Sequence, residues 1–327
     1  MGKKMVNLAI IGLGRWGRVL VDAVQGKTDL VRFTNAATRT PSKVEDYCKA
    51  NSIALTSDYS TVLSDPNIDG VVLATPHSQH EQQIIDAVQA GKNVFCEKPV
   101  TLTRKSIDNA MAQVEKYGLI FAAGHNRRFL PALEHLNSLI RSGELGRVLH
   151  IEGNMSGHVG NRYTNDMWRV DPNESPAGGM AGSGIHVIDA MIYLLGRITE
   201  VSAQSFRLVN EISLDDTTNM LFRFENGQTG YLVALTATTP TFRIQVFGEK
   251  CKVELIGENI LDIQPVDGVQ ARMTFPSIST ELRQFEEFAK CINSGEPYPI
   301  SIDDVKNGVA VFEAVSQSCE ERKWITV

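Results

Sequence analysis

The chain has 327 residues, of which 43% are hydrophobic and 21% charged, proportions that are typical of a soluble globular protein with room for two domains. The 32 basic and 38 acidic residues leave a net charge of −6, which disfavours nucleic acid or an anionic membrane as a partner. The five cysteines are scattered and form no CxxC pair, and no apolar run approaches the roughly 20 residues that cross a bilayer. We therefore expect a cytoplasmic protein with reduced thiols.

Short apolar runs alternate with amphipathic segments over the first 124 residues. They predict strands at 6–11, 31–37, 70–74, 93–96 and 119–123. A helix-start signal, Thr40-Pro41, follows the second run, and the helical segments 79–90 and 106–117 stop at Gly91 and Gly118, as helices commonly do. Strands alternating with helices predict a parallel sheet covered on both faces. Residues 1–124 are therefore predicted to form an α/β domain.

The pattern changes after Gly124. A predicted helix at 131–140 leads to a strand at 148–154 and a long polar loop up to Gly184, and from 200 to 266 strand follows strand. Asn226-Gly227 between two apolar runs is a strong hairpin signal. Helices return at 281–292 and 303–322. Residues 125–327 are therefore predicted to form an α+β domain, an open and largely antiparallel sheet with flanking helices.

A glycine-rich turn follows the first strand and opens a helix. It reads Gly12-Leu13-Gly14-Arg15-Trp16-Gly17. The first glycine suits a tight turn, the second lets the backbone approach a diphosphate, and the third lets helix and strand pack closely. The helix N-terminus would offer free N–H groups to the phosphates. We interpret the turn as part of a dinucleotide site; the alternative is a glycine-rich turn that serves packing only.

The end of the second strand bears on which dinucleotide is bound. NAD-binding units usually place an Asp or Glu about 20 residues after the glycine turn, where it binds the ribose 2′-OH. Thr38 and Arg39 occupy that place, so no carboxylate repels a 2′-phosphate and Arg39 is available to pair with one. NADP is therefore favoured over NAD. The alternative, Arg39 as an ordinary exposed arginine, leaves NAD open.

A series of motifs in chain order resembles the glucose–fructose oxidoreductase / inositol dehydrogenase (Gfo/Idh/MocA) family. After the glycine turn come Ala74-Thr75-Pro76-His77 with His80, Glu97-Lys98-Pro99, Asn126-Arg127-Arg128-Phe129, Trp168-Arg169 and Gly184-Ile185-His186-Val187-Ile188-Asp189. The resemblance covers nearly the whole chain and is specific to the superfamily rather than to a substrate. It implies a Rossmann domain followed by a largely antiparallel sheet whose outer face commonly forms the oligomer interface, so a homo-oligomer, dimer or tetramer, is expected.

The resemblance also implies roles for individual residues. It places Lys98 at the nicotinamide end of the cofactor cleft and makes Lys98-Pro99 a candidate cis peptide. Beyond the residues of the glycine turn with Thr38 and Arg39, the residues that we assign to cofactor binding are Ala74, Thr75, Pro76, His77, His80, Glu97, Lys98, Asn126, Trp168 and Arg169. His77 and His80 have a spacing that would suit a metal, but no cysteine or carboxylate cluster accompanies them, so we predict no metal site.

Two residues are predicted to carry the chemistry. Hydride transfer between a nicotinamide and an alcohol or carbonyl needs a cation or donor near the reacting oxygen and a proton acceptor. Lys98, at the carboxyl edge of the parallel sheet, fits the first role, whereas the alternative is a surface lysine at a strand end. His186 opens an apolar helix after a glycine-rich approach and fits the second role. The alternative for His186 is a structural histidine.

The sequence departs from the family at Gly182. Many members carry an Asp four residues before the catalytic histidine, where it binds substrate hydroxyls or relays the proton. The residues that we assign to substrate binding are Lys98, Asn154, His158, Arg162, Tyr163 and Asp189. An arginine and a histidine in place of an acid would suit a substrate that bears a carboxylate better than a neutral sugar.

Together these features predict an NADP- or NAD-dependent oxidoreductase acting on a hydroxylated small molecule, such as a sugar, an inositol, a cyclic diol or a related acid. A redox-neutral enzyme of the same fold, resembling a glycosidase or epimerase with a retained cofactor, is one alternative. A dinucleotide-binding protein without turnover is the other. Lys98 and His186 argue against the last, because such a protein has no need of them.

Overall fold

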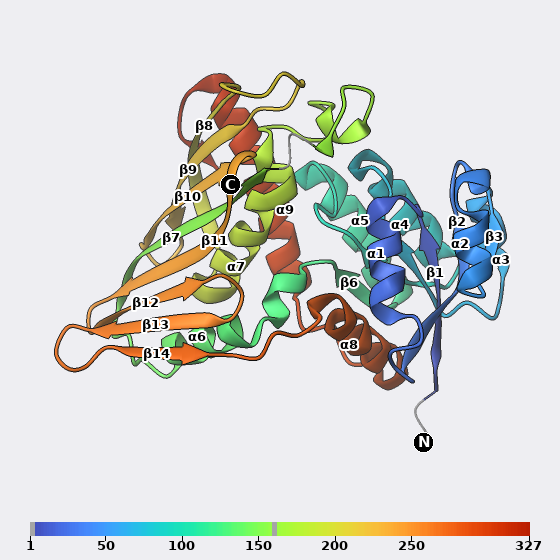
Figure 1. Ribbon diagram of the computed structural model, residues 1–327, viewed down its shortest axis with the longest axis horizontal. Coiled ribbons are helices and arrows are strands. Elements are labelled where there is room, and N and C mark those ends of the chain that lie inside the picture. Colours follow the sequence, from blue (N-terminus) through green and yellow to red (C-terminus); the bar gives the residue numbers. More distant parts are fainter. Residues whose placement is uncertain (1–3, 159–161) are drawn as a thin grey trace. The chain divides into compact units, whose positions relative to one another are not determined.

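The computed structural model describes residues 4–158 and 162–327 and divides into two compact units (Figure 1). The first unit comprises the chain up to Thr101 together with Lys105–Asn126 and Ser279–Ile302. The second comprises Leu102–Arg104, Arg127–Ile278 and Asp303–Val327. None of the helices in the described part of the chain combines the length and apolar character that a bilayer crossing requires.

The first unit is built on a parallel sheet of six strands in the order β3-β2-β1-β4-β5-β6. The strands are β1 (Val6–Ile11), β2 (Val31–Ala37), β3 (Ala54–Thr56), β4 (Gly70–Leu73), β5 (Asn93–Cys96) and β6 (Phe121–Ala123). This order reverses between β1 and β4, which is the arrangement of the doubly wound dinucleotide-binding fold. The predicted parallel sheet is confirmed. Strand β3, a three-residue edge strand with no residue that is fully buried, was not predicted, because its residues form no apolar run.

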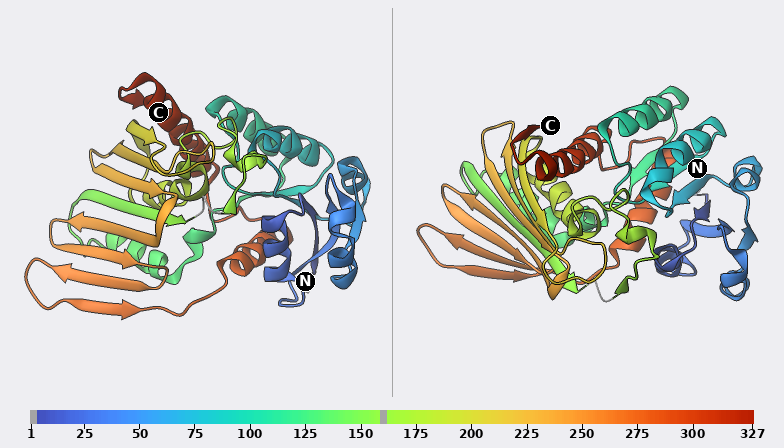
Figure 2. Two further views of the ribbon diagram at one scale, coloured as in Figure 1. Left: turned by 45° about the horizontal axis from the view of Figure 1, so that its top comes forward. Right: turned by 90° about the horizontal axis from the view of Figure 1, so that it is seen from above.

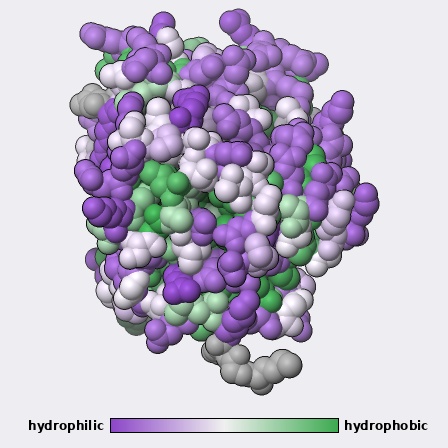
Figure 3. Space-filling view, turned by 90° about the vertical axis from the view of Figure 1, so that its right-hand side faces the viewer, coloured by the Kyte–Doolittle hydropathy of each residue, from purple (hydrophilic) through white to green (hydrophobic). Residues whose placement is uncertain are grey.

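Helices connect these strands and cover the sheet (Figure 2). They are α1 (Arg15–Val24), α2 (Glu45–Ala50), α3 (Tyr59–Ser64), α4 (His80–Gln89) and α5 (Arg104–Tyr117). All four residues of β4 are buried, as expected of a central parallel strand with helices on both faces. The surface on the side of β2, β3, α2 and α3 is mostly hydrophilic, with smaller apolar areas between the polar side chains (Figure 3).

Helix α8 (Thr280–Ser294) belongs to the first unit although it follows the second unit in the sequence. Its Phe285 ring lies with its centroid 4.5 Å from that of Phe95 and 5.7 Å from that of Phe33, and all three rings are fully buried. The boundary predicted after residue 124 assigns this helix to the second domain. The structure differs because aromatic packing between distant segments, which the order of elements does not reveal, joins α8 to the parallel sheet.

The second unit is built on a nine-stranded sheet with the order β14-β13-β12-β11-β7-β10-β9-β8-β15. The strands are β7 (Val148–His158), β8 (Ile198–Phe206), β9 (Thr217–Phe224), β10 (Thr229–Leu235), β11 (Ala237–Gly248), β12 (Cys251–Ile256), β13 (Ile260–Pro265), β14 (Ala271–Thr274) and β15 (Ile325–Thr326). Strands β7 and β10 pair in parallel, and the other neighbouring strands of this described sheet pair antiparallel. The predicted hairpin is confirmed, since β9 and β10 pair across Gly227, which has a φ of 87°.

Helices α6 (Pro131–Arg141), α7 (Ile185–Leu195) and α9 (Ile302–Glu321) complete the second unit. Strand β9 alternates buried and more exposed residues along its length. Such alternation indicates a sheet with one face on the core and the other toward solvent. A turn of π-helix, Met180–Gly184, precedes α7 directly; this turn was expected to be polar loop.

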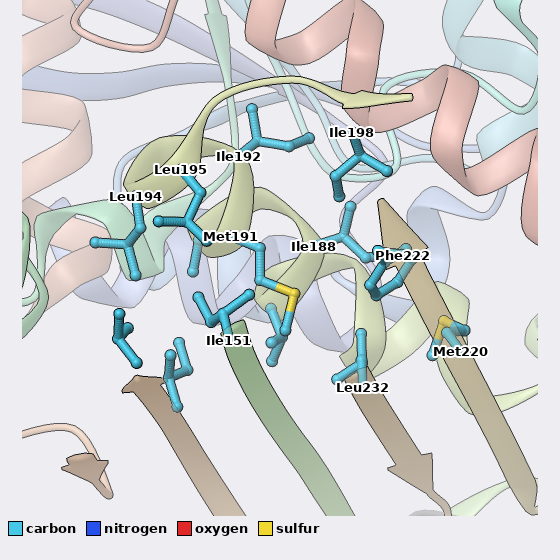
Figure 4. Packing of buried hydrophobic residues seen from close by; sticks show 14 of the residues in the cluster. Ile151, Ile188, Met191, Ile192, Leu194, Leu195, Ile198, Met220, Phe222 and Leu232 are labelled. Carbon is cyan, nitrogen blue, oxygen red and sulfur yellow. The ribbon is translucent and has the colours of Figure 1, made fainter. Parts of the chain in front are cut away.

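Helix α7 is the centre of the core of the second unit. Every residue of α7 except Tyr193 is buried. In Figure 4 its Ile188, Met191 and Ile192 lie among side chains from the sheet strands. The helix approaches β7 most closely at Gly153, where an added Cβ would lie 2.4 Å from Cγ1 of Val187. The absence of a side chain at Gly153 therefore allows α7, the helix that contains His186, to pack close to β7.

Candidate active site

The glycine turn between β1 and α1 has the geometry of a phosphate cradle. Gly12 has a φ of 93°, and a Cβ there would lie 2.7 Å from the Ala74 carbonyl oxygen. A Cβ on Gly17 would lie 2.3 Å from the carbonyl oxygen of Gly12, so neither position admits a side chain. Gly14 is different, because a Cβ there meets no atom within 4 Å. Gly14 caps α1 with no side-chain hydrogen bond, which leaves backbone N–H groups and open space for a diphosphate. The residues present therefore fit a dinucleotide.

Thr38 and Arg39 follow β2 at the carboxyl edge of the parallel sheet. The Thr38 N–H donates to the carbonyl oxygen of Thr56 at 3.1 Å, which fixes the backbone at this point. The Arg39 side chain is exposed. In the doubly wound fold the end of the second strand lies at the adenosine ribose of the bound dinucleotide, so these two residues have the position from which a 2′-substituent is read.

The loop after β4 contains Thr75 and His77, and His80 starts α4. Thr75 Oγ1 donates to Gln83 Oε1 at 2.6 Å. The His80 ring is completely buried. Its Nδ1 lies 3.1 Å from the carbonyl oxygens of both Pro99 and Val100, and its Nε2 lies 3.1 Å from that of Thr75. We assigned His80 to cofactor binding, but these contacts show that it ties the loop after β4 to the loop after β5.

His77 and His80 have the spacing that was considered for a metal site. The rings of His77 and His80 have centroids 5.8 Å apart. Among residues 4–158 and 162–327, no group of three or more His, Cys, Asp or Glu side chains is arranged to hold a metal ion. With the His80 ring engaged by backbone carbonyl groups, the spacing of the two histidines reflects the support of two loops.

The segment Glu97-Lys98-Pro99 follows β5, and its Lys98–Pro99 peptide bond is cis, as the family resemblance implied. The Glu97 side chain is buried, and the Lys98 backbone N–H donates to Glu97 Oε2 at 3.3 Å. Burial raises the pKa of Glu97 to about 7, against the opposing effects of the Trp16 indole and of Lys98. A carboxyl group that titrates near neutrality therefore lies beside the lysine predicted to be catalytic.

Asn126, also assigned to the cofactor, is buried after β6. Its Nδ2 donates to Glu281 Oε1 at 2.8 Å and to Thr280 Oγ1 at 3.1 Å. Both acceptors lie in the first turn of α8. The side-chain amide N–H groups of Asn126 therefore join α8 to the parallel sheet. The contact of Asn126 with a cofactor stays a prediction. No pattern in the sequence pointed to Glu281, which is separated from Asn126 by more than half of the second unit.

In the second unit, His186 lies in the first turn of α7 and is buried. Asp189 follows one helical turn later, on the same stripe of the helix. Both carboxylate oxygens of Asp189 accept from Arg128, Oδ2 from Nε at 2.9 Å and Oδ1 from Nη2 at 2.8 Å. Arg128 Nη1 also donates to Asp304 Oδ2 at 2.7 Å. Asp189, assigned to substrate binding, is thus committed to a buried ion pair.

Charge and stacking hold this arginine in place. Burial disfavours the charge of Arg128, but Asp189 and Asp304 together raise its pKa well above the usual range. The guanidinium carbon lies 5.0 Å from the ring centroid of Tyr193 on α7. One bidentate contact with Asp189 and a cation–π contact with Tyr193 therefore attach the start of the second unit to α7, the helix that carries His186.

The remaining predicted substrate residues lie on or after β7. Asn154 Oδ1 accepts from Ser156 Oγ at 2.6 Å. His158 ends the strand, and Arg162 and Tyr163 follow residues 159–161, which lie outside the described residues. Their substrate contacts stay predictions. Position 182 lies in the π-helical turn, and a Cβ on Gly182 meets no atom within 4 Å, so the site has room for the side chain that this sequence lacks.

Trp168 and Arg169, predicted to contact the cofactor, form a short 3-10 helix, Trp168–Val170, in the second unit. The Arg169 guanidinium carbon lies 4.1 Å from the ring centroid of Trp168. The two side chains therefore stack on each other, a contact that restricts both rotamers. Their contact with a cofactor stays a prediction.

Comparison with known proteins agrees with both units. A model of the oxidoreductase family with NAD-binding Rossmann fold matches residues 6–125, and a model of the GFO/IDH/MocA C-terminal domain matches residues 133–254. The scyllo-inositol 2-dehydrogenase (NAD(+)) of Bacillus subtilis is 29% identical, with 92% of this chain and 91% of that protein covered. The myo-inositol 2-dehydrogenase of Thermotoga maritima is 25% identical, with 97% of each covered.

Among solved structures, a candidate NADPH-dependent oxidoreductase from Desulfitobacterium hafniense superposes with a TM-score of 0.92 at 25% identity, over 99% of this chain and 98% of that one. The family models account for the parallel-sheet unit with its glycine cradle and for most of the antiparallel unit with α7. The chain therefore belongs to the Gfo/Idh/MocA family and is an oxidoreductase with an NAD-binding Rossmann domain.

Proposed function

We propose that the protein is an NADP(H)-dependent dehydrogenase or reductase that acts on a CH–OH group of a hydroxylated small molecule, with Lys98 and His186 as its catalytic residues. The substrate class comprises sugars, inositols, cyclic diols and related acids. Two inositol dehydrogenases among the relatives support this class. The observation that carries the proposal is the position of Lys98, directly after β5 in the same unit as the glycine cradle.

The chain would hold the dinucleotide through named groups. The backbone N–H groups at Gly14 and the start of α1 would bind the diphosphate, and Thr38 and Arg39 would contact the adenosine ribose. When bound, the nicotinamide supplies the group that accepts or donates the hydride. A guanidinium in place of the usual carboxylate favours a 2′-phosphate, because arginine pairs with phosphate through two parallel hydrogen bonds. The D. hafniense relative, described by its NADPH dependence, agrees with this preference.

Lys98 would stabilise the reacting oxygen. An ammonium group near that oxygen lowers the energy of the negative charge that develops on it in the transition state. The buried Glu97 lies beside Lys98, and burial with neighbouring charges is the means by which proteins tune a lysine for such a role.

His186 would accept or return the proton of the substrate hydroxyl. An imidazole titrates near neutrality and is the commonest proton carrier in enzymes. It lies in a helix that is fixed by Gly153 beneath α7 and by the Arg128–Asp189 ion pair one turn further on. A base on a rigid, buried helix keeps its orientation toward a substrate, so less entropy is lost in reaching a reactive geometry.

The loop after β7 would select the substrate. His158 and Arg162 are exposed polar groups on either side of residues 159–161, and Gly182 leaves the position of the family acid without a carboxylate. An arginine and a histidine in this segment, with glycine at position 182, favour a substrate that bears a carboxylate. Replacing Arg162 by Ala should therefore raise the apparent KM for acidic substrates and leave that for neutral polyols unchanged. An unchanged KM for every substrate would contradict this part of the proposal.

A homo-oligomer formed through the open face of the nine-stranded sheet is also proposed. Leu221 on β9 is 46% exposed and pairs directly with Tyr231 on β10, so apolar groups are adjacent on this face. Replacing Leu221 by Glu should reduce the mass measured by light scattering from that of an oligomer to that of a monomer. A wild-type protein that is already monomeric would refute the proposal.

The test of the main proposal is a screen of hydroxylated compounds and their oxidised forms, followed by absorbance of the reduced nicotinamide, with NADP(H) and NAD(H) in parallel. Lys98→Met should abolish turnover and leave the dinucleotide Kd nearly unchanged, because the lysine acts on the substrate oxygen. Dinucleotide binding without turnover on any compound would refute the proposal. A dinucleotide that stays bound through purification and does not exchange, with a redox-neutral product, would indicate the glycosidase-like or epimerase-like alternative.

A further inference from the structure

Glu97 is an acid in a place that does not favour its charge. Its side chain is 5% exposed, and its Oε1 atom is buried with no hydrogen-bond partner. The backbone of Gly124 presses against it, since a Cβ on Gly124 would lie 2.9 Å from Glu97 Oε1. Its Oε2 atom accepts from the Lys98 N–H at 3.3 Å. A buried carboxylate with so few donors is more stable when it carries a proton.

The indole of Trp16 lies next to this carboxyl group. Its Nε1 is buried, and its N–H acts as a donor toward Glu97 that lowers the pKa of this carboxyl group. Trp16 is the second residue of α1 and belongs to the glycine turn. The carboxyl group of Glu97 therefore links the phosphate cradle to the segment that contains Lys98.

A second carboxylate comes from α8. Glu281 is the second residue of that helix, after the N-cap Ser279. Its Oε1 accepts from Asn126 Nδ2 at 2.8 Å and its Oε2 from Thr280 Oγ1 at 3.4 Å. Both carboxylate oxygens of Glu281 therefore have hydrogen-bond donors, and the group lies near the positive end of the dipole of α8. The negative charge of Glu281 in turn acts on Glu97 and favours the protonated form of Glu97.

The surroundings of Glu97 and of Glu281 thus differ in the hydrogen bonds that they offer to a negative charge. The charged or titratable neighbours of Glu97 are Lys98, Glu281 and the buried thiol of Cys96, whose pKa burial and Glu97 both raise. Burial, the largest effect, brings the pKa of Glu97 to about 7.

We propose that Glu97 is a positioning residue that carries a proton in the resting enzyme, with Glu281 as its ionised partner, and that this pair controls the charge of Lys98. The inference rests on the proposed catalytic function of Lys98. When Glu97 is neutral, Lys98 loses its proton more readily; when Glu97 ionises, a negative charge beside Lys98 retains the ammonium form. A residue encoded near the C-terminus would in this way tune a lysine in the dinucleotide-binding unit.

The protonation itself is testable without any substrate. Infrared spectra of the protein freed of nucleotide should contain, at neutral pH, a carbonyl stretch of a protonated carboxylic acid. This band should be absent in Glu97→Gln, and in Glu281→Gln it should disappear at a lower pH than in the wild type, because the repelling charge is gone. Glu286→Gln, a neighbouring carboxylate on α8 with no contact to Glu97 among those described, should leave the band unchanged. A band that is identical in wild type and Glu97→Gln would overturn the proposal.

The effect on Lys98 is tested by the pH dependence of kcat/KM. In Glu97→Gln the limb of the profile that reports the ionisation of Lys98 should move to lower pH by about one unit, whichever protonation state of the lysine turnover requires. A profile equal to that of Glu286→Gln would refute control of Lys98 by the pair. If the wild type turned over no compound, the proposed function would fail, and the infrared result would still decide the protonation of Glu97.

Discussion

Arg128 donates hydrogen bonds to both carboxylate oxygens of Asp189. The side chains of Arg128 and Asp189 are only 6% and 4% exposed. The first comes from the segment directly after β6 and the second from the middle of α7. A buried ion pair contributes little to stability compared with apolar side chains of the same shape, but the removal of one partner leaves an uncompensated charge in the core. The pair therefore fixes α7 in one position and makes that position sensitive to either residue.

Asp189→Asn should lower the free energy of unfolding by about 3 kcal/mol, because Arg128 then keeps only Asp304 as an ionised partner. Chemical denaturation measures this change. Asp262→Asn is the matched control, since Asp262 pairs with Arg272 on the surface of β13 and β14, where exposed ion pairs contribute little. Equal stability of Asp189→Asn and the wild type would show that the buried pair is not required.

Arg39→Ala should reduce kcat/KM with NADP(H) about 10-fold to 100-fold, the range expected for loss of hydrogen bonds to a charged group. The value with NAD(H) should change much less, because the ribose hydroxyl carries no charge. Arg32→Ala on β2, the strand that Arg39 follows, is the control; Arg32 is exposed and its Nε donates to Asn7 Oδ1. Steady-state kinetics with NADP(H) and with NAD(H) measures both values of kcat/KM. An equal loss of kcat/KM with the two dinucleotides would rule out a contact between Arg39 and the 2′-phosphate.

Gly182→Asp should fold normally, since the added Cβ meets no atom within 4 Å. It restores a carboxylate at the position where family members bind substrate hydroxyls, so kcat/KM for neutral polyols should rise relative to that for acidic compounds. Gly179→Asp on the same approach is the contrasting variant, because a Cβ there would lie 2.7 Å from Cγ2 of Thr236. Thermal unfolding and the substrate panel together test this prediction; a Gly182→Asp protein that fails to fold would disprove the space inferred at this position.

Gly153→Ala should destabilise the second unit by roughly 1–3 kcal/mol, the usual cost of overpacking a tight core. The new methyl group would lie 2.4 Å from Cγ1 of Val187 and 3.0 Å from Cε of Met191, so α7 has to shift. Gly157→Ala on the same strand meets no atom within 4 Å and should be neutral. Urea unfolding compares the two, and similar midpoints would contradict the close seating of α7 on β7.

The stability of the protein should depend on pH through Glu97. Its folded pKa of about 7 exceeds the value near 4.3 of an unfolded glutamate, so the native state binds more protons between these values. The contribution of Glu97 to stability is therefore complete below the unfolded pKa and is lost as the pH rises through the folded one. Over this range the loss amounts to about 3 kcal/mol. In Glu97→Gln the decline should disappear, so denaturation between pH 4 and 8 provides the measurement; a parallel decline in the variant would assign it to other groups.

The parallel sheet, the antiparallel sheet and the hairpin at Gly227 could be predicted from the sequence, because they follow from apolar periodicity and from glycine at defined turns. The glycine cradle and the cis bond before Pro99 were also foreseen, the second through the family resemblance. The partners of Asp189, His80 and Asn126 were not. Each is a polar residue whose contacts lie far away along the chain, so no local pattern distinguishes a residue held inside the protein from one that faces a ligand.

The return of α8 to the first unit means that the dinucleotide-binding fold is not encoded by one continuous stretch. A fragment ending at Asn126 would lack the rings of Phe285 and Phe288 that cover Phe95, and its Asn126 amide would lose both acceptors on α8. During synthesis on the ribosome, the parallel sheet is therefore complete only after most of the remaining chain, including α8, has been made. Grafting this cofactor module onto another protein would require a design that carries α8 along, for example by circular permutation.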